Sequence, residues 1–395
     1  MLHKPLSVLF LSNGHGEDAA AAGLATALRE RAEMRQRAYP TVGAGAAYEE
    51  AGLEVLGPRN SLPSGGLTFH SWQNFLRDLR AGLSPLTFKQ WLELRTLRTD
   101  VLVTVGDAYA LLLSSQVKAR RRFYVQMLVS AYHANATTQL NRYFMEGFSP
   151  LERFLMHRLT ERVYVRDEAS ALWLRERGVA QVSALGNPAL DRLSPKAPLN
   201  LQDRPLIALL PGSRTYRYRA LALMMAALGQ LPSVTGLLAW TGGELPEVEG
   251  WISEPGIAEP GLRRVYRRGD TAIFVYENRF ADILHAAQLA LGTAGTAHEQ
   301  AASLGKPVVT FALPPDYTPA FVANQKRLLA EALTVASARP EAVADALQTL
   351  YNDPNQYRRA KAAGRSRMGE PGGSARIAAD ILVRLEMPAA QLKTS

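Results

Sequence analysis

The chain has 395 residues, of which 47% are apolar and 21% charged, a composition typical of a folded protein rather than a disordered one. A chain of this length is longer than a domain with one hydrophobic core usually is, and it is typical of two domains. The chain contains no cysteine, which excludes disulfides, thiolate nucleophiles and cysteine-ligated zinc. The formal net charge of +9 favours an anionic partner, either a nucleic acid, an anionic lipid or a phosphorylated small molecule.

The first residues, MLHKPLSVLFLSNG, run from a short apolar stretch directly into a glycine loop without a small-residue cleavage site. We therefore interpret them as a strand and not as a signal peptide. No window reaches the roughly 18 consecutive apolar residues that a membrane span requires. We expect a cytoplasmic protein for which contact with a membrane surface stays possible.

Short apolar runs that end in turn residues recur along the chain. The first series is VLFLSNG at 8, VLVTVGD at 101, FYVQMLV at 123, VYVRDEA at 163 and VSALGNP at 182. The second is LIALLPGSR at 206, GLLAWTGG at 236, AIFVYEN at 272 and LALGTAGTAHEQAASLGKPVVTF at 289. Stretches with helical spacing lie between several of these runs, so the chain is predicted to form α/β domains with parallel sheets.

A polar, proline-bearing segment, 194–205, separates the two series and is typical of an interdomain linker. We therefore expect two doubly wound domains with a cleft between them. After Arg339 the pattern predicts two amphipathic helices, PEAVADALQTLYND and SARIAADILVRLEM. The intervening GRSRMGEPGG is interpreted as a flexible hinge before the last helix.

The first glycine loop, SNGHGEDAAAAG at 12–23, resembles a phosphate cradle but carries Glu17 and Asp18 where the helix should begin. Two carboxylates would repel a bound phosphate, although both can simply complement a helix dipole. His15 could bind a ligand, relay protons or be a turn residue.

The loop PGSR after the run at 206 lacks a carboxylate and suits an anion. Gly212 lets the backbone approach a ligand, Ser213 offers a hydroxyl and an amide, and Arg214 can grip a diphosphate. The alternative is an ordinary strand-to-helix turn with a surface arginine.

A second anion candidate is GTAGTAHEQ at 292–300. Gly295 and Thr296 would supply amides at a helix start, while Glu299 and Gln300, one turn later, could accept ribose hydroxyls. Two such loops at the carboxyl ends of predicted strands strengthen each other, because ligands bind there in open sheets.

Asp107, in VTVGDAY, is predicted at the end of a buried strand. A carboxylate there can be desolvated and act as a general base, or it can cap the following helix. The seven histidines show no metal-ligand spacing, so we expect no metal site.

Residues 67–98 combine aromatic and basic side chains in two amphipathic helical stretches. Such helices either cover a sheet or lie on a membrane surface, and two tryptophans with five cations favour the membrane. The side chains expected to face the acceptor or membrane are Trp72, Phe75 and Trp91.

The order SNGHGED, VGDAY, LGNPALD, LLPGSR and GTAGTAHEQAASLGKPVV resembles lipid-A-disaccharide synthase and, more closely, its related proteins of unassigned substrate. LPPDYTPAFVANQKRLL at 313–329 is similar to the related group in particular. The resemblance covers nearly the whole chain and implies the GT-B fold, two facing Rossmann-like domains. It implies an N-terminal acceptor domain at 1–195, a donor domain at 204–372, and a C-terminal helix at 373–395 that packs on the first domain.

The resemblance also implies an inverting, metal-independent glycosyltransferase without a cofactor, which moves a sugar from a UDP-sugar to a lipid acceptor. Asp107 matches the family's essential aspartate, and Arg214 matches its arginine. Gln300 stands where the synthase has glutamate, with Glu299 adjacent, which leaves the ribose contact open. The implied location is the inner face of the cell membrane, with an anionic membrane surface as a partner and a homodimer as one possibility.

In this interpretation Asp107 removes the acceptor proton, while Glu17 and Asp18 accept hydrogen bonds from hydroxyls. The nearest alternatives are a UDP-sugar epimerase of the same fold and a non-catalytic nucleotide-sugar-binding protein. A nicotinamide-dependent oxidoreductase is disfavoured because neither glycine loop has an acidic strand end about 20 residues later. Nucleic-acid binding is disfavoured because the cations are scattered and no recognised motif occurs.

Overall fold

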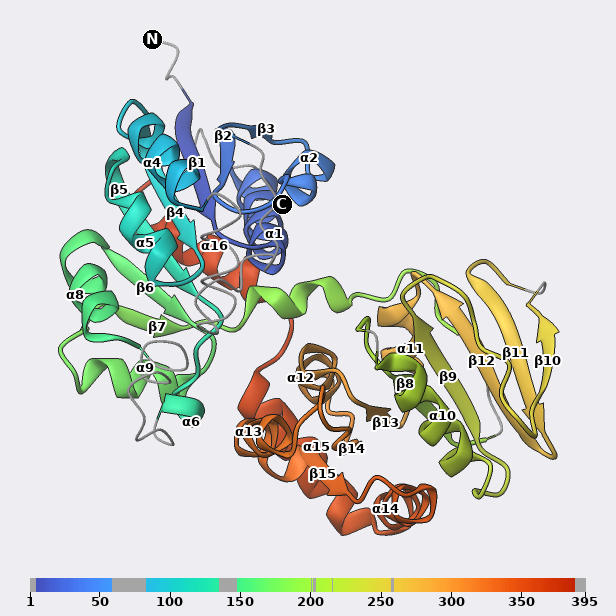
Figure 1. The fold of residues 1–395 in the computed structure, drawn as a ribbon. Helices are drawn as coiled ribbons and strands as arrows, with labels where there is room; N and C mark the ends of the chain where they lie inside the picture. The colour runs from blue at the N-terminus through green and yellow to red at the C-terminus, as the bar shows by residue number, and fades with distance from the viewer. Residues whose placement is uncertain are drawn as a thin grey trace. The chain divides into compact units, whose positions relative to one another are not determined.

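The computed structural model describes residues 5–58, 83–134, 148–199, 201, 204–214, 216–256 and 259–387. The chain divides into two compact units (Figure 1). Unit 1 comprises Met1–Asp191 and Pro371–Ser395, and unit 2 comprises Arg192–Glu370. The chain thus passes from one unit to the other just before the polar segment 194–205, and returns at Pro371.

Unit 1 is built on a seven-stranded sheet in the order β3-β2-β1-β4-β5-β6-β7, in which all neighbouring strands are parallel. The strands are β1 (Leu6–Ser12), β2 (Met34–Pro40), β3 (Glu54–Val55), β4 (Arg98–Val105), β5 (Lys118–Gln126), β6 (Arg162–Val165) and β7 (Val182–Ala184). After β1 the chain forms β2, which pairs with β1 on one side. The later strand β4 pairs with β1 on its other side. The loops after β1 and β4 therefore flank a topological switch point, where open α/β sheets bind ligands.

Helices cover both faces of this sheet because its strands are apolar on both sides. Val8 and Phe10 pack into one core with helices α1 and α16, whereas Leu9 and Leu11 pack into another with α5. The helices are α1 (His15–Arg31), α2 (Ala46–Glu50), α4 (Leu83–Leu94), α5 (Ala108–Ser114), α6 (Ala131–Ala134), α8 (Pro150–Leu159), α9 (Glu168–Arg175) and α16 (Gly373–Arg384). A 3₁₀ helix, η2, spans Pro188–Leu193.

The last helix, α16, belongs to unit 1 and packs against α1 (Figure 1). Asp191 fixes its start, because the carboxylate accepts hydrogen bonds from the amides of Gly372, Gly373 and Ser374 at 2.5, 3.0 and 2.6 Å. The LGNPALD stretch at 185–191 thereby docks a helix that is distant in sequence.

Unit 2 is built on an eight-stranded sheet in the order β10-β11-β12-β9-β8-β13-β14-β15. Its strands are β8 (Leu206–Leu210), β9 (Thr235–Trp240), β10 (Ile252–Pro255), β11 (Leu262–Arg268), β12 (Thr271–Glu277), β13 (Leu289–Gly292), β14 (Val308–Phe311) and β15 (Leu333–Ala336). The pairs β10–β11 and β11–β12 are antiparallel and the remaining pairs are parallel. The switch point lies at β8 and β13.

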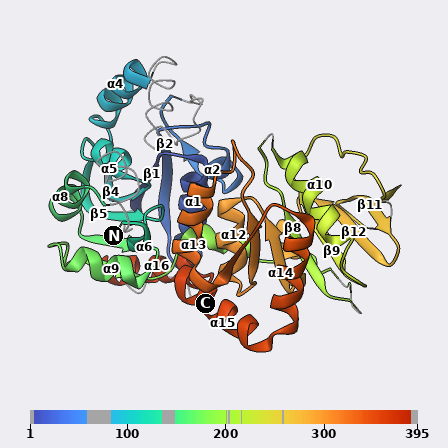
Figure 2. The same cartoon turned by 60° about the horizontal axis from the view of Figure 1, so that its bottom comes forward.

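The core of unit 2 is built mainly from α10, α14 and the strands around β8 and β9, which lie side by side in Figure 2. The helices are α10 (Arg217–Leu228), α11 (Phe280–Ala286), α12 (Gly295–Ser303), α13 (Pro319–Leu329), α14 (Pro340–Asn352) and α15 (Pro354–Met368), with the 3₁₀ turn η3 (Ala330–Ala332). Within the described residues, no helix has both the length and the apolar character that crossing a membrane requires.

The hinge expected at GRSRMGEPGG is wrong over its first half, because Gly364 to Met368 continue helix α15. Gly364 is not a helix breaker here. A Cβ at this position would lie 2.4 Å from the carbonyl oxygen of Ala302, so glycine lets α15 pass close to α12. Tertiary packing therefore overrides the local signal of the glycine.

Candidate functional site

The switch point of unit 1 joins the loops that follow β1 and β4. Asn13, after β1, donates a hydrogen bond from Nδ2 to Oδ1 of Asp107, after β4, at 2.6 Å. Gly106 has φ +148°, and a Cβ on it would lie 1.9 Å from Oδ1 of Asn13, so only glycine permits this approach. Oδ1 of Asn13 is buried and has no hydrogen-bond partner among the described residues. Asn13 therefore joins the two loops through its contact with Asp107.

Asp107 is the N-cap of α5, which was one of the two interpretations of this residue. Its Oδ1 accepts hydrogen bonds from the amides of Tyr109 at 2.9 Å and Ala110 at 3.3 Å. The side chain is half-buried at the carboxyl end of β4. Helix capping explains the contacts of Oδ1 with these two amides. The role of Asp107 as a general base stays a prediction.

Glu17 and Asp18 lie in the first turn of α1, and both are buried. Burial raises the pKa of Glu17 from 4.5 to about 7, with the charge of Asp107 adding to the effect, and burial raises the pKa of Asp18 from 3.8 to about 7. Oδ1 of Asp18 accepts a hydrogen bond from Ser12 at 2.6 Å, and the Ser12 hydroxyl also pairs with Tyr48 at 2.5 Å. Asp18 therefore anchors the loop from inside.

The Glu17 side chain folds back over the loop, since a Cβ on Gly14 would lie 2.4 Å from Oε2 of Glu17. His15 is exposed at the first position of α1, and its ring lies against Gly43. The contacts of Glu17, Asp18 and His15 with substrate stay predictions.

A buried polar network behind Asp107 was not found from the sequence. Glu152 on α8 is buried and accepts hydrogen bonds from Gln126 Nε2 at 2.7 Å and from Tyr124 at 2.8 Å. Burial, with a smaller contribution from the charge of Asp107, raises the pKa of Glu152 from 4.5 to about 7 despite these hydrogen bonds. Glu152 lies 45 positions after Asp107 in the sequence and follows no motif, so only the fold brings them together.

The switch point of unit 2 joins the two loops predicted to bind an anion. Thr293 links them, because its amide donates to the carbonyl of Leu210 at 3.0 Å and its hydroxyl donates to that of Pro211 at 3.2 Å. Gly212 has φ +84°, and a Cβ on it would lie 3.2 Å from Cβ of Ala294. The Tyr216 hydroxyl donates to the carbonyl of Thr293 at 2.9 Å. The sequence did not indicate that Thr293 and Tyr216 hold the two loops together by hydrogen bonds.

These loops present backbone donors and a cation. Helix α12 begins at Gly295, and no side chain caps its first turn, to which Thr296 belongs. Ser213 and Arg214 are exposed, and the Arg214 side chain has no hydrogen bond or ion pair within the described part of the chain. The first amides of α12 and the guanidinium together suit an anion.

Glu299 and Gln300, predicted near the ribose, are both half-buried on α12. They lie in the second turn of this helix, after the amides of its first turn. No group of histidine, aspartate and glutamate side chains suited to a metal ion occurs among the described residues.

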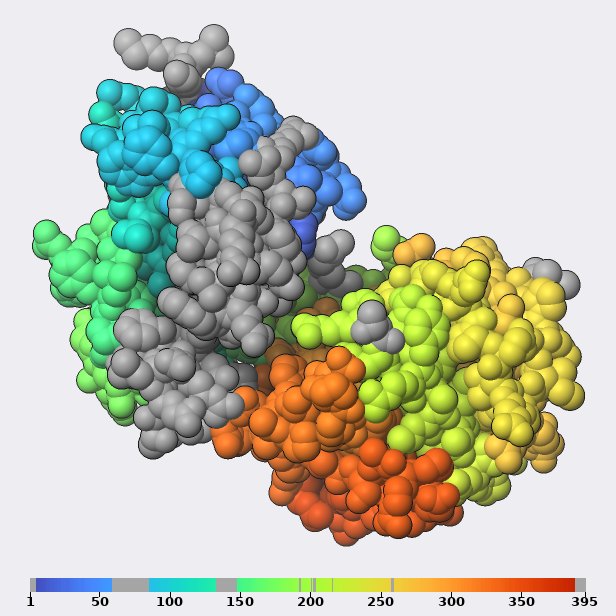
Figure 3. Space-filling view, viewed as in Figure 1, coloured from blue at the N-terminus to red at the C-terminus, as the bar shows by residue number. Residues whose placement is uncertain are grey.

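The aromatic segment is described only from residue 83 onward, so the predictions for Trp72 and Phe75 lie outside the described residues. Trp91 on α4 is half-buried, packs against the core formed with α5 and stacks on Phe88, with ring centroids 6.4 Å apart. Phe88 and Leu92 are 63% and 46% exposed. Figure 3 shows the cyan residues of α4 at the surface of unit 1.

Comparison with known proteins shows similarity at the level of the fold. No protein-family profile matches the chain, and no curated protein sequence matches it. Among solved structures, the calicheamicin glycosyltransferase CalG4 has 15% identity and a TM-score of 0.62, over 97% of this chain and 100% of that one. A proposed UDP-N-acetylglucosamine 2-epimerase from Listeria monocytogenes has 15% identity and a TM-score of 0.59, over 99% and 100%. S. aureus MnaA in complex with UDP has 15% identity and a TM-score of 0.59, over 98% of both chains.

The chain therefore has the α/β GT-B fold, with two Rossmann-like domains, as the order of its motifs implied. The similar structures include both a glycosyltransferase and an epimerase by name, so the fold alone does not choose between these activities. The similarity does not single out lipid-A-disaccharide synthase among proteins of this fold.

Proposed function

We propose that the protein is a glycosyltransferase that transfers a sugar from a UDP-sugar with inversion and without a metal ion. The observation that carries this proposal is the opposite chemistry of the two switch points. The loops of unit 2 offer amides and Arg214 without a carboxylate, whereas those of unit 1 carry Asp107 and Glu17. The first set suits a diphosphate and the second suits hydroxyl groups.

Unit 2 binds the donor in this proposal. Arg214 and the amides of Gly212, Ser213, Gly295 and Thr296 stabilise the negative charge that develops on the departing diphosphate, which many enzymes neutralise with a metal ion. Glu299 or Gln300 accepts a hydrogen bond from the ribose. The UDP bound to the similar MnaA structure supports a nucleotide diphosphate as the ligand.

Unit 1 takes the acceptor. The acceptor oxygen attacks the anomeric carbon and forms the new C–O bond, while the bond from that carbon to the phosphate oxygen breaks and UDP leaves with the electron pair. Asp107 accepts the proton that the acceptor hydroxyl loses. A single displacement of this kind inverts the anomeric configuration. Glu17 accepts a hydrogen bond from a substrate hydroxyl, and Asn13 holds Asp107 in position.

The proposed acceptor is a lipid, as the resemblance of the motifs to lipid-A-disaccharide synthase implies. The exposed Phe88 and Leu92 on α4 supply apolar surface for such a ligand. We accordingly propose that the protein works at the cytoplasmic surface of the membrane, bound to anionic lipid.

A UDP-sugar epimerase is the second candidate. Glu17, with a pKa of about 7, could both give and take a proton near neutral pH, and inversion at a carbon bearing hydrogen needs both steps. The two candidates differ in their products. Transfer consumes the UDP-sugar and releases UDP, whereas epimerisation returns an isomeric UDP-sugar.

The test is to incubate the full chain with UDP-N-acetylglucosamine, UDP-glucose or UDP-galactose and a bacterial lipid extract, and to measure UDP release and new glycolipids by mass spectrometry. We expect UDP release that requires lipid and persists in EDTA, and a product whose anomeric configuration, read by NMR, is opposite to that of the donor. Lipid-independent conversion of one UDP-sugar into its isomer would establish the epimerase instead.

Two variants separate donor binding from chemistry. Asp107→Asn keeps a helix cap, so it should fold and bind UDP normally but lose turnover by about 10² to 10⁴. Arg214→Ala should weaken UDP binding by roughly 1.5–3 kcal/mol, the contribution of a hydrogen bond to a charged group. Asp353→Asn, at the N-cap of α15, is the matched control and should change neither quantity. Full turnover in Asp107→Asn would disprove its role as the base.

A further inference from the structure

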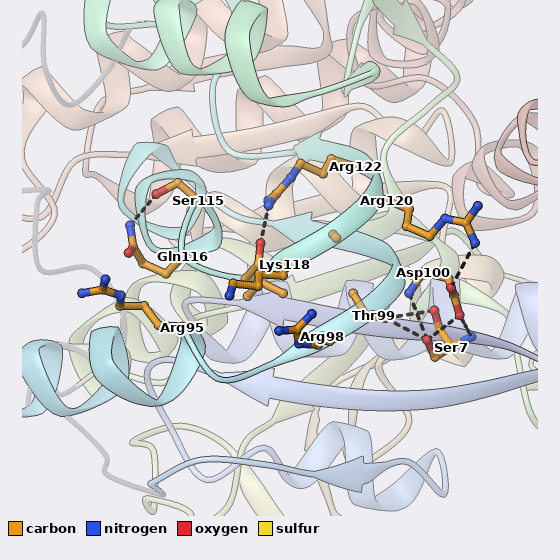
Figure 4. Close-up of a pocket in the computed structure, with 12 residues that line it drawn as sticks. Ser7, Arg95, Arg98, Thr99, Asp100, Ser115, Gln116, Lys118, Arg120 and Arg122 are labelled. Carbon is orange, nitrogen blue, oxygen red and sulfur yellow. Dashed lines mark hydrogen bonds and ion pairs between the residues drawn. The ribbon is translucent and has the colours of Figure 1, made fainter.

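A basic pocket lies at the opposite end of the sheet of unit 1 from the candidate site. It has a volume of about 910 Å³ and is lined at the amino ends of β4 and β5 (Figure 4). Its charged lining residues are the cations Arg95, Arg98, Lys118, Arg120 and Arg122 and a single acid, Asp100. We call this cavity the basic pocket.

Two of the cations are engaged with the protein itself. Arg122 donates to the carbonyls of Ser114, at 2.9 Å, and Val117, and so closes the turn between α5 and β5. Arg120 lies 3.8 Å from Asp100, whose other oxygen accepts hydrogen bonds from Ser7 at 2.7 and 2.9 Å. Asp100, the only acid among the described residues that line the pocket, is therefore already in use.

Arg98 and Lys118 have no such partner. Neither side chain makes a hydrogen bond or ion pair with any residue in the described ranges. They are also register partners on the parallel strands β4 and β5, about 4.8 Å apart along the hydrogen-bonding direction, and point to the same face of the sheet. Like charges placed directly opposite each other destabilise a sheet.

The alternation of β5 concentrates charge on this face. Lys118, Arg120 and Arg122 are spaced by two residues and share one face, whereas Arg121 faces the other side and pairs with Glu161. Glu161 thus neutralises the arginine on the opposite face of the sheet. Among the described residues, no acid pairs with Arg98 or Lys118 in the pocket.

The basic pocket is separate from the residues proposed to act on the sugar. Arg98 begins β4, and Asp107 follows the end of the same strand. Eight residues of strand at about 3.3 Å each place the two roughly 25 Å apart. A ligand in the pocket therefore cannot be the diphosphate or the acceptor hydroxyl that reacts at Asp107.

We propose that the basic pocket binds a phosphate group carried by a second ligand, as a phosphomonoester, a diphosphate or the phosphate of a lipid headgroup. The guanidinium of Arg98 supplies a planar fork of donors that matches phosphate oxygens, and Lys118 supplies a compact positive charge. Arg95, held with its guanidinium carbon 4.5 Å from the centroid of the Trp91 ring, adds a third positive charge at the rim.

The test is titration of the full chain with pyrophosphate at low salt, by calorimetry, and co-sedimentation with phosphatidylcholine vesicles with or without 30% phosphatidylglycerol. The variant R98Q/K118Q removes the unpaired charges. R359Q/K361Q removes one arginine and one lysine from the surface of α15 and is the matched control. R214A reports pyrophosphate that binds at the proposed donor loop instead.

We expect the binding of at least one probe to weaken tenfold or more in R98Q/K118Q while R359Q/K361Q retains it, and we expect the same loss when R98Q/K118Q is compared with R214A as the parent, in which the donor loop contributes less. Loss for pyrophosphate assigns a soluble ligand, and loss only for the phosphatidylglycerol vesicles assigns a lipid headgroup. Lys118→Gln alone should weaken the same binding about threefold, which keeps the test available if the double variant does not fold. Absence of both interactions in the wild type, or equal losses in the double variant and its control, would overturn the proposal.

Discussion

At the scale of single residues, the unusual feature is a pair of carboxyl groups buried at the start of a helix. Burial is the largest cause of the raised pKa of Asp18, the charge of Glu17 adds to it, and the hydrogen bond from Ser12 offsets it only in part. A carboxyl with a pKa of about 7 in the folded chain and 3.8 unfolded holds its proton more tightly when folded. Folding stability must then fall as pH rises from about 4 to about 7.

Asp18→Asn tests this linkage, because asparagine keeps the shape and cannot ionise. Between pH 5 and pH 8 the wild type should lose roughly 2 kcal/mol relative to the variant, since one pKa unit corresponds to about 1.4 kcal/mol. Urea unfolding at both values measures the difference. Asp316→Asn, at an exposed aspartate, controls for the lost charge. A constant gap between wild type and Asp18→Asn across this range would contradict a neutral Asp18 in the folded protein.

The sequence indicated the loops but not the partners inside them. Glycine and acidic residues after an apolar run were enough to select 12–18 and 106–107, because turn chemistry is local. Asn13 and Glu152 were missed because their importance depends on groups that only the fold brings near: Asn13 meets Asp107 across two strands, and Glu152 lies on α8. Periodicity cannot report such contacts.

At the scale of elements, α16 shows how a carboxylate can join distant parts of the chain. The helix buries Ile377 and Ile381 in the core shared with α1, and Asp380 accepts a hydrogen bond from Tyr164 at 2.7 Å. Its N-terminal amides have no cap from their own segment, so Asp191 supplies it. The LGNPALD motif therefore has a structural role that the sequence alone did not indicate.

Asp191→Ala should reduce the free energy of unfolding by about 2 kcal/mol, because it removes a helix cap and charged hydrogen bonds together. The C-terminal segment should also become more sensitive to protease, as judged by mass spectrometry of the fragments. Asp191→Asn retains an acceptor and should lose about half as much. If Asp191→Ala and wild type unfold at the same urea concentration, the carboxylate does not hold α16 in place.

At the scale of the whole molecule, the alternation of strands and helices predicted the α/β class, and the motif order predicted the GT-B fold. The antiparallel strands β10 and β11 were missed because EPGIAEPGLRRVYRR alternates irregularly between charged and apolar residues. Helix α15 was missed because Gly364 suggests the end of a helix, whereas in the structure it allows close contact with α12. Edge elements and close helix contacts depend on neighbours that no local window contains.

The proposed membrane association belongs to the scale of the whole chain, because the proposal combines the net charge of +9 with the apolar surface of α4. Phe88 and Leu92 are exposed, whereas Trp91 packs against the core, so the three side chains should respond differently to removal. We expect the wild type to co-sediment with anionic vesicles at low salt, and F88S/L92S to lose most of this binding with an unchanged melting temperature. Trp91→Ser should instead lower the melting temperature.

The matched control for this prediction is L151S/F154S, which removes an exposed leucine and phenylalanine from α8, where they are 52% and 60% exposed. Loss of apolar surface as such would weaken vesicle binding equally in both double variants. If α4 contributes specifically, only F88S/L92S should weaken vesicle binding. High salt, which screens the basic residues, should weaken the residual vesicle binding of this variant further. Undiminished vesicle binding by F88S/L92S would place the membrane contact elsewhere on the chain.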